Sequence, residues 1–207
     1  MDVTHPVPAQ AAGAPEADGP ARCPWGAEPA DYRVYHDTEW GRPVRGDDAL
    51  FERLSLEAFQ SGLSWLTILR RREGFRLAFA DFRIRKVAAF TPDDIQRLLG
   101  DPGIIRNRAK IEATVHNARI AADWAEGELT ELLWSFAPER PAPPPRTPAE
   151  VPAVTPESTA MARALKKRGF RFVGPTTAYA LMQACGLVND HLADCHARTL
   201  GEAGEAV

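Results

Sequence analysis

Two cysteines and two histidines offer one set of metal ligands from opposite ends of the chain. Cys23 and His36 lie near the start of the 207 residues, and His191 and Cys195 lie near the end. Two thiolates and two imidazoles complete the tetrahedral ligand set of a structural zinc ion. In a zinc finger both ligand pairs belong to one short module, whereas here most of the chain separates them. One ion bound by all four side chains would therefore fix the two ends of a larger folded body to each other.

The spacing of these four side chains does not by itself establish a metal site. Three cysteines and five histidines in a chain of this length also reach such spacings by chance. His196 directly follows Cys195 and is a competing ligand, and Cys185 lies six residues before His191. Because Cys185 lies in an apolar run, a buried thiol is the favoured interpretation for it.

Composition narrows the class of protein. A hydrophobic content of 44% is enough for one sizeable core, in one body or in two lobes. The chain has no apolar run long enough to span a membrane, so we expect a soluble, cytoplasmic protein without a membrane partner. Residues 1–21 are rich in Ala and Pro and lack the hydrophobic segment of a signal peptide, so we expect a disordered tail. The sequence gives no indication of contacts between copies, and a monomer is expected.

The hydrophobic pattern is helical through most of the chain. Leu50, Leu54 and Ala58 share one helix face, and there is no persuasive alternation with the period of two that is typical of a strand. Thr-Pro pairs followed by acidic residues, at 91–94 and 155–157, predict helix starts with Thr as the N-cap. We therefore predict an all-α fold.

A proline-rich segment interrupts this pattern. Residues 138–156 are poor in apolar side chains and cannot form a packed element of their own, so we expect a surface loop. Because the ligands at the two ends require those ends to meet, this loop belongs to a single domain of residues 22–196 and does not tether two free domains. Residues 197–207 are expected to form a short C-terminal tail.

The distribution of charge matters more than its sum. A net charge of −3 disfavours nucleic acid, because affinity for DNA depends on neutralising phosphates. The cations nevertheless gather in three clusters, which are Arg70–Arg72, then Arg106, Arg108 and Lys110, and finally Lys166–Arg168 with Arg171. One such cluster is typical of a solvated helix face, whereas three can form a local basic face.

The sequence around the ligands closely resembles a known family. The resemblance runs in order from about residue 22 to residue 195 and is that of the bacterial 3-methyladenine DNA glycosylase I family. It rests on the segments RCPWG at 22–26, YRVYHDTEWG at 32–41, LEAFQSGLSW at 56–65, GIIRNRAK at 103–110, LKKRGFRFVG at 165–174 and MQACGLVNDH at 182–191. In that family a structural zinc ion is held by the residues that correspond to Cys23, His36, His191 and Cys195.

A helix, a glycine turn and a second helix are expected over residues 95–118. The pattern resembles the helix-hairpin-helix of DNA repair glycosylases, although Pro-Gly-Ile-Ile at 102–105 departs from the usual Pro-Gly-Val-Gly. Such a turn can present backbone N–H groups to a phosphate. The alternative is a helical hairpin with a purely structural glycine corner. The resemblance implies that the residues in contact with the DNA backbone are Gly103, Arg106, Arg108 and Lys110.

The corner at Gly62 and Leu63 resembles the plug of the family. An enzyme that acts on one base of a duplex must extrude that base, and a side chain must then fill the gap. Packing of Leu63 in the core is an equally good interpretation of the local pattern.

Glu57 lies on or beside an apolar helix stripe, three residues after Leu54. A carboxylate at such a place is costly unless it has partners. From the pattern alone, Glu57 reaches the surface or caps a neighbouring helix. The resemblance implies instead that Glu57 contacts the extruded base, and a catalytic role in activating water is a hypothesis.

Trp and Tyr side chains concentrate in the first third of the chain. Their electron-rich faces suit a purine made cationic by methylation, because ring faces attract cations. Trp40 is the first candidate for core packing. The predicted substrate-binding residues are Trp25, Tyr32, Tyr35 and Trp65, with the last two as the best candidates for stacking on the base.

The resemblance implies a monofunctional glycosylase. It would hydrolyse the N-glycosidic bond of 3-methyladenine in alkylated double-stranded DNA and leave an abasic site, while acceptance of 3-methylguanine stays open. One rival is a bifunctional enzyme in which Lys110 forms a Schiff base, although Asp123 is not at the spacing such enzymes use. Another is a zinc-containing DNA-binding protein without catalysis.

Overall fold

The computed structural model describes residues 19–200, and every regular element in that part of the chain is a helix, which confirms the all-α prediction. The α-helices are α1 (Ala30–Thr38), α2 (Asp47–Gln60), α3 (Trp65–Leu69), α4 (Arg72–Ala78), α5 (Ile84–Ala88), α6 (Pro92–Gly100), α7 (Arg108–Ala122), α8 (Glu128–Trp134), α9 (Pro156–Lys167), α10 (Pro175–Ala184) and α11 (Ala197–Leu200). The 3₁₀ turns are η1 (Pro24–Gly26), η2 (Ala80–Phe82) and η3 (Pro148–Glu150).

Both predicted helix starts are confirmed. The Thr91 side chain accepts a hydrogen bond from the Asp94 amide, and the Asp94 carboxylate accepts one from the Thr91 amide. Thr155 and Ser158 form the same reciprocal pair at the start of α9. A proline occupies the first turn of each helix, where its missing N–H has no partner to lose.

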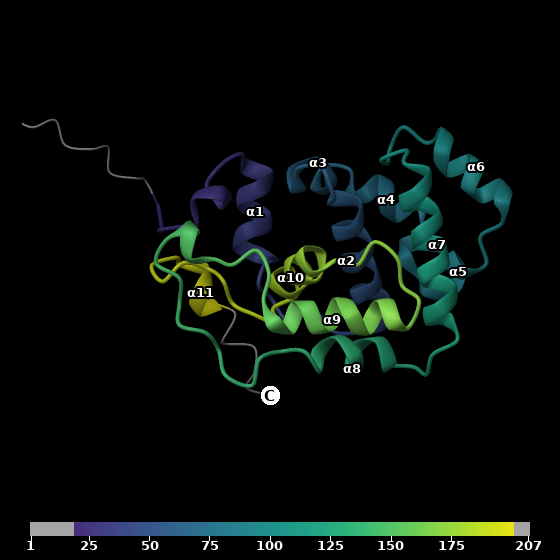
Figure 1. Ribbon diagram of the computed structural model, residues 1–207. Coiled ribbons are helices and arrows are strands. Elements are labelled where there is room, and N and C mark those ends of the chain that lie inside the picture. Colours follow the sequence, from purple (N-terminus) through teal and green to yellow (C-terminus); the bar gives the residue numbers. More distant parts are fainter. Residues whose placement is uncertain (1–18, 201–207) are drawn as a thin grey trace, which may run out of the picture.

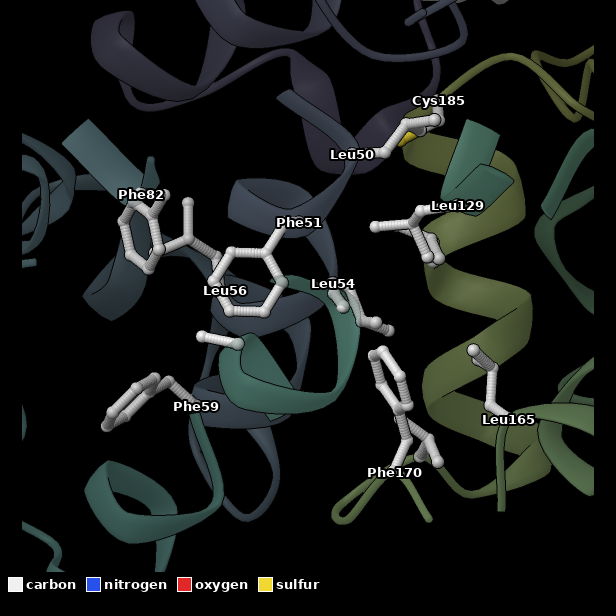
Figure 2. Packing of buried hydrophobic residues seen from close by; sticks show 14 of the residues in the cluster. Leu50, Phe51, Leu54, Leu56, Phe59, Phe82, Leu129, Leu165, Phe170 and Cys185 are labelled. Carbon is white, nitrogen blue, oxygen red and sulfur yellow. The ribbon is translucent and has the colours of Figure 1, made fainter. Parts of the chain in front are cut away.

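The core forms around α2, which packs against α3, α8 and α10. Figure 2 shows Phe51 and Leu54 of α2 among the side chains that the other helices contribute. Leu165 from α9 and Phe170 after it complete this side of the cluster, and all four are at most 3% exposed. Because α2 is enclosed by apolar side chains, any polar group on its inner face is held away from bulk water.

The two ends of the described chain meet on one side of the molecule. α1 and α11 lie at that side in Figure 1, and α4 to α7 lie at the other. The His196 amide donates a hydrogen bond to the Ala21 carbonyl at 2.9 Å, and the Ala193 amide donates one to the Pro145 carbonyl at 2.8 Å. The proline-rich segment is therefore fastened to the C-terminal part of the chain.

The C-terminal boundary differs from the sequence prediction. Residues 197–200 were expected in a tail, but they form α11, with Ala197 buried. Arg198 donates hydrogen bonds to the carbonyls of His191 and Asn189 at 2.7 and 3.1 Å. The folded part thus extends past Cys195, because the α11 side chains contact the loop before it. The remainder of that predicted tail, and all but residues 19–21 of the N-terminal one, lie outside the described residues.

Across residues 19–200, the helices are all too short or too polar to cross a membrane.

Candidate functional site

The structure brings the predicted metal ligands together in one buried cluster. We call it the four-ligand cluster, formed by Cys23, His36, His191 and Cys195. Their ligand atoms all lie within 4.8 Å of one another, and Cys195 Sγ is 3.5 Å from both His36 Nε2 and His191 Nδ1. Cys23 Sγ lies 3.7 Å from His191 Nδ1. The arrangement can hold one metal ion between η1, α1 and the loop before α11.

The outward-facing nitrogen of each imidazole already has a partner. His36 Nδ1 lies 2.8 Å from the Asp37 carboxylate, and His191 Nε2 lies 3.1 Å from the Trp40 carbonyl. Arg22 forms an ion pair with the same carboxylate at 2.9 Å, and His196 Nε2 reaches it at 3.0 Å. Partners of this kind orient a metal-binding histidine and fix its tautomer. His196, the competing ligand, is thus placed as a partner of Asp37.

A glycine makes room for the His36 ring. A Cβ atom added to Gly26 would lie 2.4 Å from two atoms of that ring, which is far inside van der Waals contact. Only glycine fits at this place without a shift of η1 or α1. The close approach explains why the short turn after Cys23 ends in glycine.

A cavity of about 340 Å³ lies beside the four-ligand cluster. We call it the aromatic cavity. All five side chains predicted to act on the base line it, namely Trp25, Tyr32, Tyr35, Glu57 and Trp65. Trp40 also lines it, so its partly buried ring is both a core contact and a cavity wall. Because α1, α2 and α3 each contribute to the walls, the cavity depends on how these helices pack.

Glu57 presents its carboxyl group to the aromatic cavity from the inner face of α2. The residue is 5% exposed, and its carboxyl group forms no hydrogen bond with any other residue in 19–200. Burial raises the pKa of Glu57 to about 8, although the charge of Arg53 opposes this shift. A buried acid without a hydrogen-bond partner destabilises the protein while the cavity is empty. Strongly shifted pKa values of this kind are common at binding sites.

The aromatic rings form two tilted pairs around this acid. The ring centroids of Trp25 and Tyr32 are 5.1 Å apart, and those of Tyr35 and Trp65 are 5.4 Å apart. The buried Trp65 Nε1 has no hydrogen-bond partner within the described part of the chain. Burial raises the pKa of Tyr35 well above its usual range, so its hydroxyl stays protonated and can donate.

Several cavity residues were not singled out from the sequence. Gln60, Gln183 and Asp190 contribute polar groups, and Pro148 and Val151 contribute apolar ones from the proline-rich segment. The Asp190 carboxylate accepts a hydrogen bond from Gln183 at 2.8 Å. Gln60 lies one helix turn after Glu57, a spacing that could have indicated it. No local pattern points to the proline-rich segment, because it reaches the cavity only through long-range folding.

The predicted hairpin consists of α6, a turn over residues 101–107, and α7. The second helix begins at Arg108, with Asn107 as its N-cap. The Gly103 amide donates to the Asp101 carboxylate at 2.7 Å, so this N–H is already occupied. A Cβ atom on Gly74 of α4 would lie 2.5 Å from the Gly103 carbonyl, which shows how closely the turn packs on α4.

Lys110 differs from its predicted place on a DNA-binding surface. It is 7% exposed, and its ammonium group donates to the carbonyls of Phe59 and Ser61 at 2.8 and 2.5 Å. Burial lowers the pKa of Lys110. Because these donors point into the protein, Lys110 supports the corner between α2 and α3 and is not available to a phosphate.

That corner presents Gly62 and Leu63 to solvent. Gly62 has a φ of +81°, which favours glycine, and Leu63 is 41% exposed. The core-packing alternative for Leu63 is therefore wrong. An exposed leucine at the tip of a held turn is free to contact another molecule.

The three basic clusters differ in how many of their charges are available. Arg70, Arg71 and Arg72 bind Asp31, the Pro102 carbonyl and Glu39, respectively. In the second cluster Arg108 pairs with Glu112 at 3.3 Å, whereas Arg106 is exposed. In the third, Arg168 pairs with Glu128. The exposed cations without an ion pair among residues 19–200 include, from these clusters, Arg106, Lys166, Lys167 and Arg171.

Known proteins resemble this chain over most of its length. The methyladenine glycosylase family matches residues 25–199. DNA-3-methyladenine glycosylase 1 of Escherichia coli (strain K12) is 46% identical over 177 residues, which cover 84% of this chain and 95% of the relative. DNA-3-methyladenine glycosylase of Haemophilus influenzae is 45% identical over 184 residues, covering 86% and 98%.

Solved structures of 3-methyladenine DNA glycosylase I also resemble this chain over most of its length. A crystal structure of 3-methyladenine DNA glycosylase I has a TM-score of 0.81 at 44% identity, covering 85% of this chain and 98% of the other. A structure of 3-methyladenine DNA glycosylase I from Staphylococcus aureus, solved to explain 3-methyladenine recognition, has a TM-score of 0.80 at 37% identity. It covers 86% of this chain and 96% of the other.

Proposed function

The chain belongs to the methyladenine glycosylase family, and we propose that it hydrolyses the N-glycosidic bond of 3-methyladenine in alkylated double-stranded DNA. The products are the free base and an abasic site. The observation that carries this proposal is the buried acid Glu57 in the aromatic cavity. A duplex-binding protein without catalysis needs neither a buried acid nor a hollow lined by aromatic rings.

The chemistry of the base matches the walls of the cavity. Methylation at N3 places a positive charge on the base within DNA, and aromatic faces attract cations. A cationic base would also favour the ionised form of Glu57, since an opposite charge nearby lowers the pKa of an acid. The unpartnered carboxyl group of Glu57 can then gain the hydrogen bonds that the empty cavity lacks.

Capture and orientation can account for much of the catalysis. Methylation already makes the base a good leaving group, so the enzyme needs little acid catalysis. In this proposal Glu57 selects the base through hydrogen bonds to its edge, while Tyr35 and Trp65 stack against it. The base is thereby held in the geometry in which its bond to the sugar breaks, and water then adds to the sugar.

We propose zinc as the ion of the four-ligand cluster. Zn–S bonds of about 2.3 Å and Zn–N bonds of about 2.0 Å in a tetrahedron place neighbouring ligand atoms about 3.3 to 3.8 Å apart. The separations of 3.5, 3.5 and 3.7 Å between the sulfur and nitrogen atoms fit this range. Four protein ligands leave no open position for a water molecule, so bound zinc would supply structure and no chemistry.

Duplex DNA would approach at the corner between α2 and α3. We propose that Leu63 fills the gap left by the extruded base, and that α6 and α7 form a helix-hairpin-helix. Arg106 and Arg108 are the proposed phosphate contacts, whereas the Gly103 N–H already donates to Asp101 and is left out of this surface. Because Lys110 is buried, it is left out of this surface, and we propose a monofunctional enzyme. We further propose that it acts as a monomer in which residues 22–200 form a single domain.

Release of free 3-methyladenine from alkylated duplex DNA tests the proposal. The parent protein should release the base from methylated DNA and none from an undamaged control. Glu57→Gln should lose base binding, and full retention of the excision rate would exclude a catalytic role for this side chain. Binding of methylated DNA without release of any base would favour the non-catalytic rival.

A borohydride trap separates the bifunctional rival from the monofunctional enzyme. No covalent adduct of protein and DNA should form, because the Lys110 ammonium is bound to two carbonyl groups. A trapped adduct that disappears in Lys110→Arg would contradict the proposal.

A further inference from the structure

α7 carries three buried polar side chains, Lys110, Thr114 and Asn117, and the Thr114 hydroxyl donates to the Lys110 carbonyl within the helix. Lys110 and Asn117 are seven residues apart, which is close to two full helix turns. They are 7% and 5% exposed. Each one holds a loop that comes from another part of the chain, so this face of α7 fixes two corners relative to each other.

The first corner is the one between α2 and α3. The Lys110 ammonium binds the Ser61 carbonyl at 2.5 Å, and the exposed Leu63 follows two residues later. The second is the α9–α10 corner, residues 168–174. The Asn117 amide group donates to the Arg171 carbonyl at 3.0 Å and accepts from the Arg171 amide at 2.8 Å. Both backbone groups of Arg171 are thus fixed.

Phe172 follows this fixed residue and has two unusual properties. Its side chain is 41% exposed, as much as that of Leu63. Its φ is +55°, in the left-handed region where a bulky side chain is strained and glycine is favoured. A strained and exposed aromatic residue adds little to folding, so a contact with another molecule is the natural reason for it.

The charges around Phe172 indicate the kind of partner. Lys166, Lys167 and Arg171 are exposed and form no ion pair with any residue from 19 to 200. Arg171 directly precedes Phe172, and Lys166 and Lys167 lie in the last turn of α9, just before the same corner. Available cations match the negative backbone of a nucleic acid, and aromatic rings stack on bases of any sequence.

We propose that Phe172 is a second apolar contact with the DNA duplex, and that it stacks on a base near the one that Leu63 replaces. The inference rests on the proposed function. Seven residues along α7 correspond to about 10 Å. This distance is close to three base steps of about 3.4 Å. The two corners are held by side chains of one helix at about this spacing, and the proposal places both apolar side chains on one duplex.

Phe172→Gly is the informative variant, because it removes the ring and relieves the strain together. The variant should unfold at the same temperature as the parent or at a higher one. Its affinity for a fluorescein-labelled duplex with a tetrahydrofuran abasic analogue should fall by about tenfold. Phe172→Trp keeps an aromatic ring and should restore most of that affinity. Leu77→Ala is the control, since Leu77 is 83% exposed on α4 and should leave binding unchanged.

A second measurement locates the contact. 2-Aminopurine placed within three steps of the abasic analogue should change its fluorescence on binding the parent protein, but not on binding Phe172→Gly. Unchanged affinity and unchanged fluorescence in Phe172→Gly would overturn the inference. Loss of self-association in Phe172→Gly, with normal binding of DNA, would overturn it in favour of contact between copies.

Two further readouts keep this inference separate from the proposed function. Binding of free 3-methyladenine, followed by tryptophan fluorescence, should be the same in Phe172→Gly and in the parent. A parent protein that releases no 3-methyladenine would contradict the proposed function, whatever Phe172 does. A parent protein that releases the base, with full duplex affinity in Phe172→Gly, would contradict only the role of Phe172.

Discussion

At the scale of single residues, Glu57 shows a conflict between folding and function. The pattern of α2 places this acid on the inner face of a helix that otherwise buries Leu50, Phe51 and Leu54. Its carboxyl group lacks a hydrogen bond from residues 19–200, and burial raises its pKa to about 8. A residue that destabilises the protein without ligand in this way is best explained by the ligand that it binds.

The first prediction concerns the stability of Glu57→Gln as a function of pH. Between the usual pKa of 4.5 and the folded-state pKa of about 8, the folded protein keeps a proton that the unfolded chain has lost. The parent therefore loses stability as the pH rises through this window. Glu57→Gln cannot ionise, so its free energy of unfolding should exceed that of the parent by about 2 kcal/mol or more at pH 9.

Urea unfolding at pH 5, 7 and 9 measures this difference. It should shrink as the pH is lowered toward 5. Glu112→Gln, on the exposed face of α7, should stay within about 0.5 kcal/mol of its parent. A difference for Glu57→Gln that does not change with pH would show that the acid is not buried as described.

A second prediction concerns Asp37, which binds His36 Nδ1 at 2.8 Å. Asp37→Asn removes the charge that orients this ring, so zinc should bind about 10 to 100 times more weakly. Competition with a chromophoric chelator measures the affinity. Asp31→Asn is the matched control, because Asp31 also pairs with an arginine but lies away from the four-ligand cluster. Equal zinc affinities in the two variants would contradict a role for Asp37.

At the scale of elements, α7 organises the loops that surround it. Its buried Lys110 holds the end of α2, and its buried Asn117 holds the α9–α10 corner. Neither contact is visible in the sequence, where Lys110 is one more cation in a basic cluster. Burial, and not the local pattern, decides whether such a cation faces solvent.

The third prediction tests this support. Lys110→Met leaves the carbonyls of Phe59 and Ser61 without their donor, which should lower the free energy of unfolding by about 1 to 3 kcal/mol. Chemical denaturation measures the loss. Arg106→Met removes an exposed cation nearby and should change the stability by about 0.5 kcal/mol or less. Similar losses in both variants would mean that the ammonium group contributes nothing specific.

Local chemistry predicted some elements well and others poorly. The capping Thr-Pro pairs located the starts of α6 and α9, because a cap is formed by neighbouring residues. The start of α7 was not located from the sequence, and Asn107, four residues after Gly103, forms its N-cap. The role of segment 138–156 as a cavity wall depends on its attachment to the C-terminal part of the chain, which no local pattern encodes.

At the scale of the whole molecule, the four-ligand cluster and the aromatic cavity share a wall. Cys23 and Leu192 line the cavity, and the His191 ring is bound to the Trp40 carbonyl. The Cys/His set was a candidate from its chemistry, and the resemblance identified it as a metal site. The aromatic cavity residues were predicted from their ring faces, and Glu57 was predicted because the resemblance named it. The shape of the cavity needed the structure.

The fourth prediction is that loss of the metal ion loosens the fold and the cavity together. Cys23→Ser, or treatment with a strong chelator, should lower the unfolding temperature and weaken the binding of free 3-methyladenine, because both depend on the same segment. Calorimetry and tryptophan fluorescence measure the two effects. Cys185→Ser alters a buried thiol outside the cluster and should keep its metal. Loss of the metal without any loss of base binding would contradict this coupling.

The long separation of the metal-binding residues in the sequence also determines when their site can form during synthesis. Cys23 and His191 are 168 positions apart, so the ribosome adds the second ligand long after the first. At about 5 to 20 residues per second, this delay is roughly 8 to 34 s. For most of that time Trp25 and Tyr35 have been synthesised, but the residues that fasten them in place do not yet exist. A nascent chain therefore cannot hold a damaged base until translation has passed the last ligand.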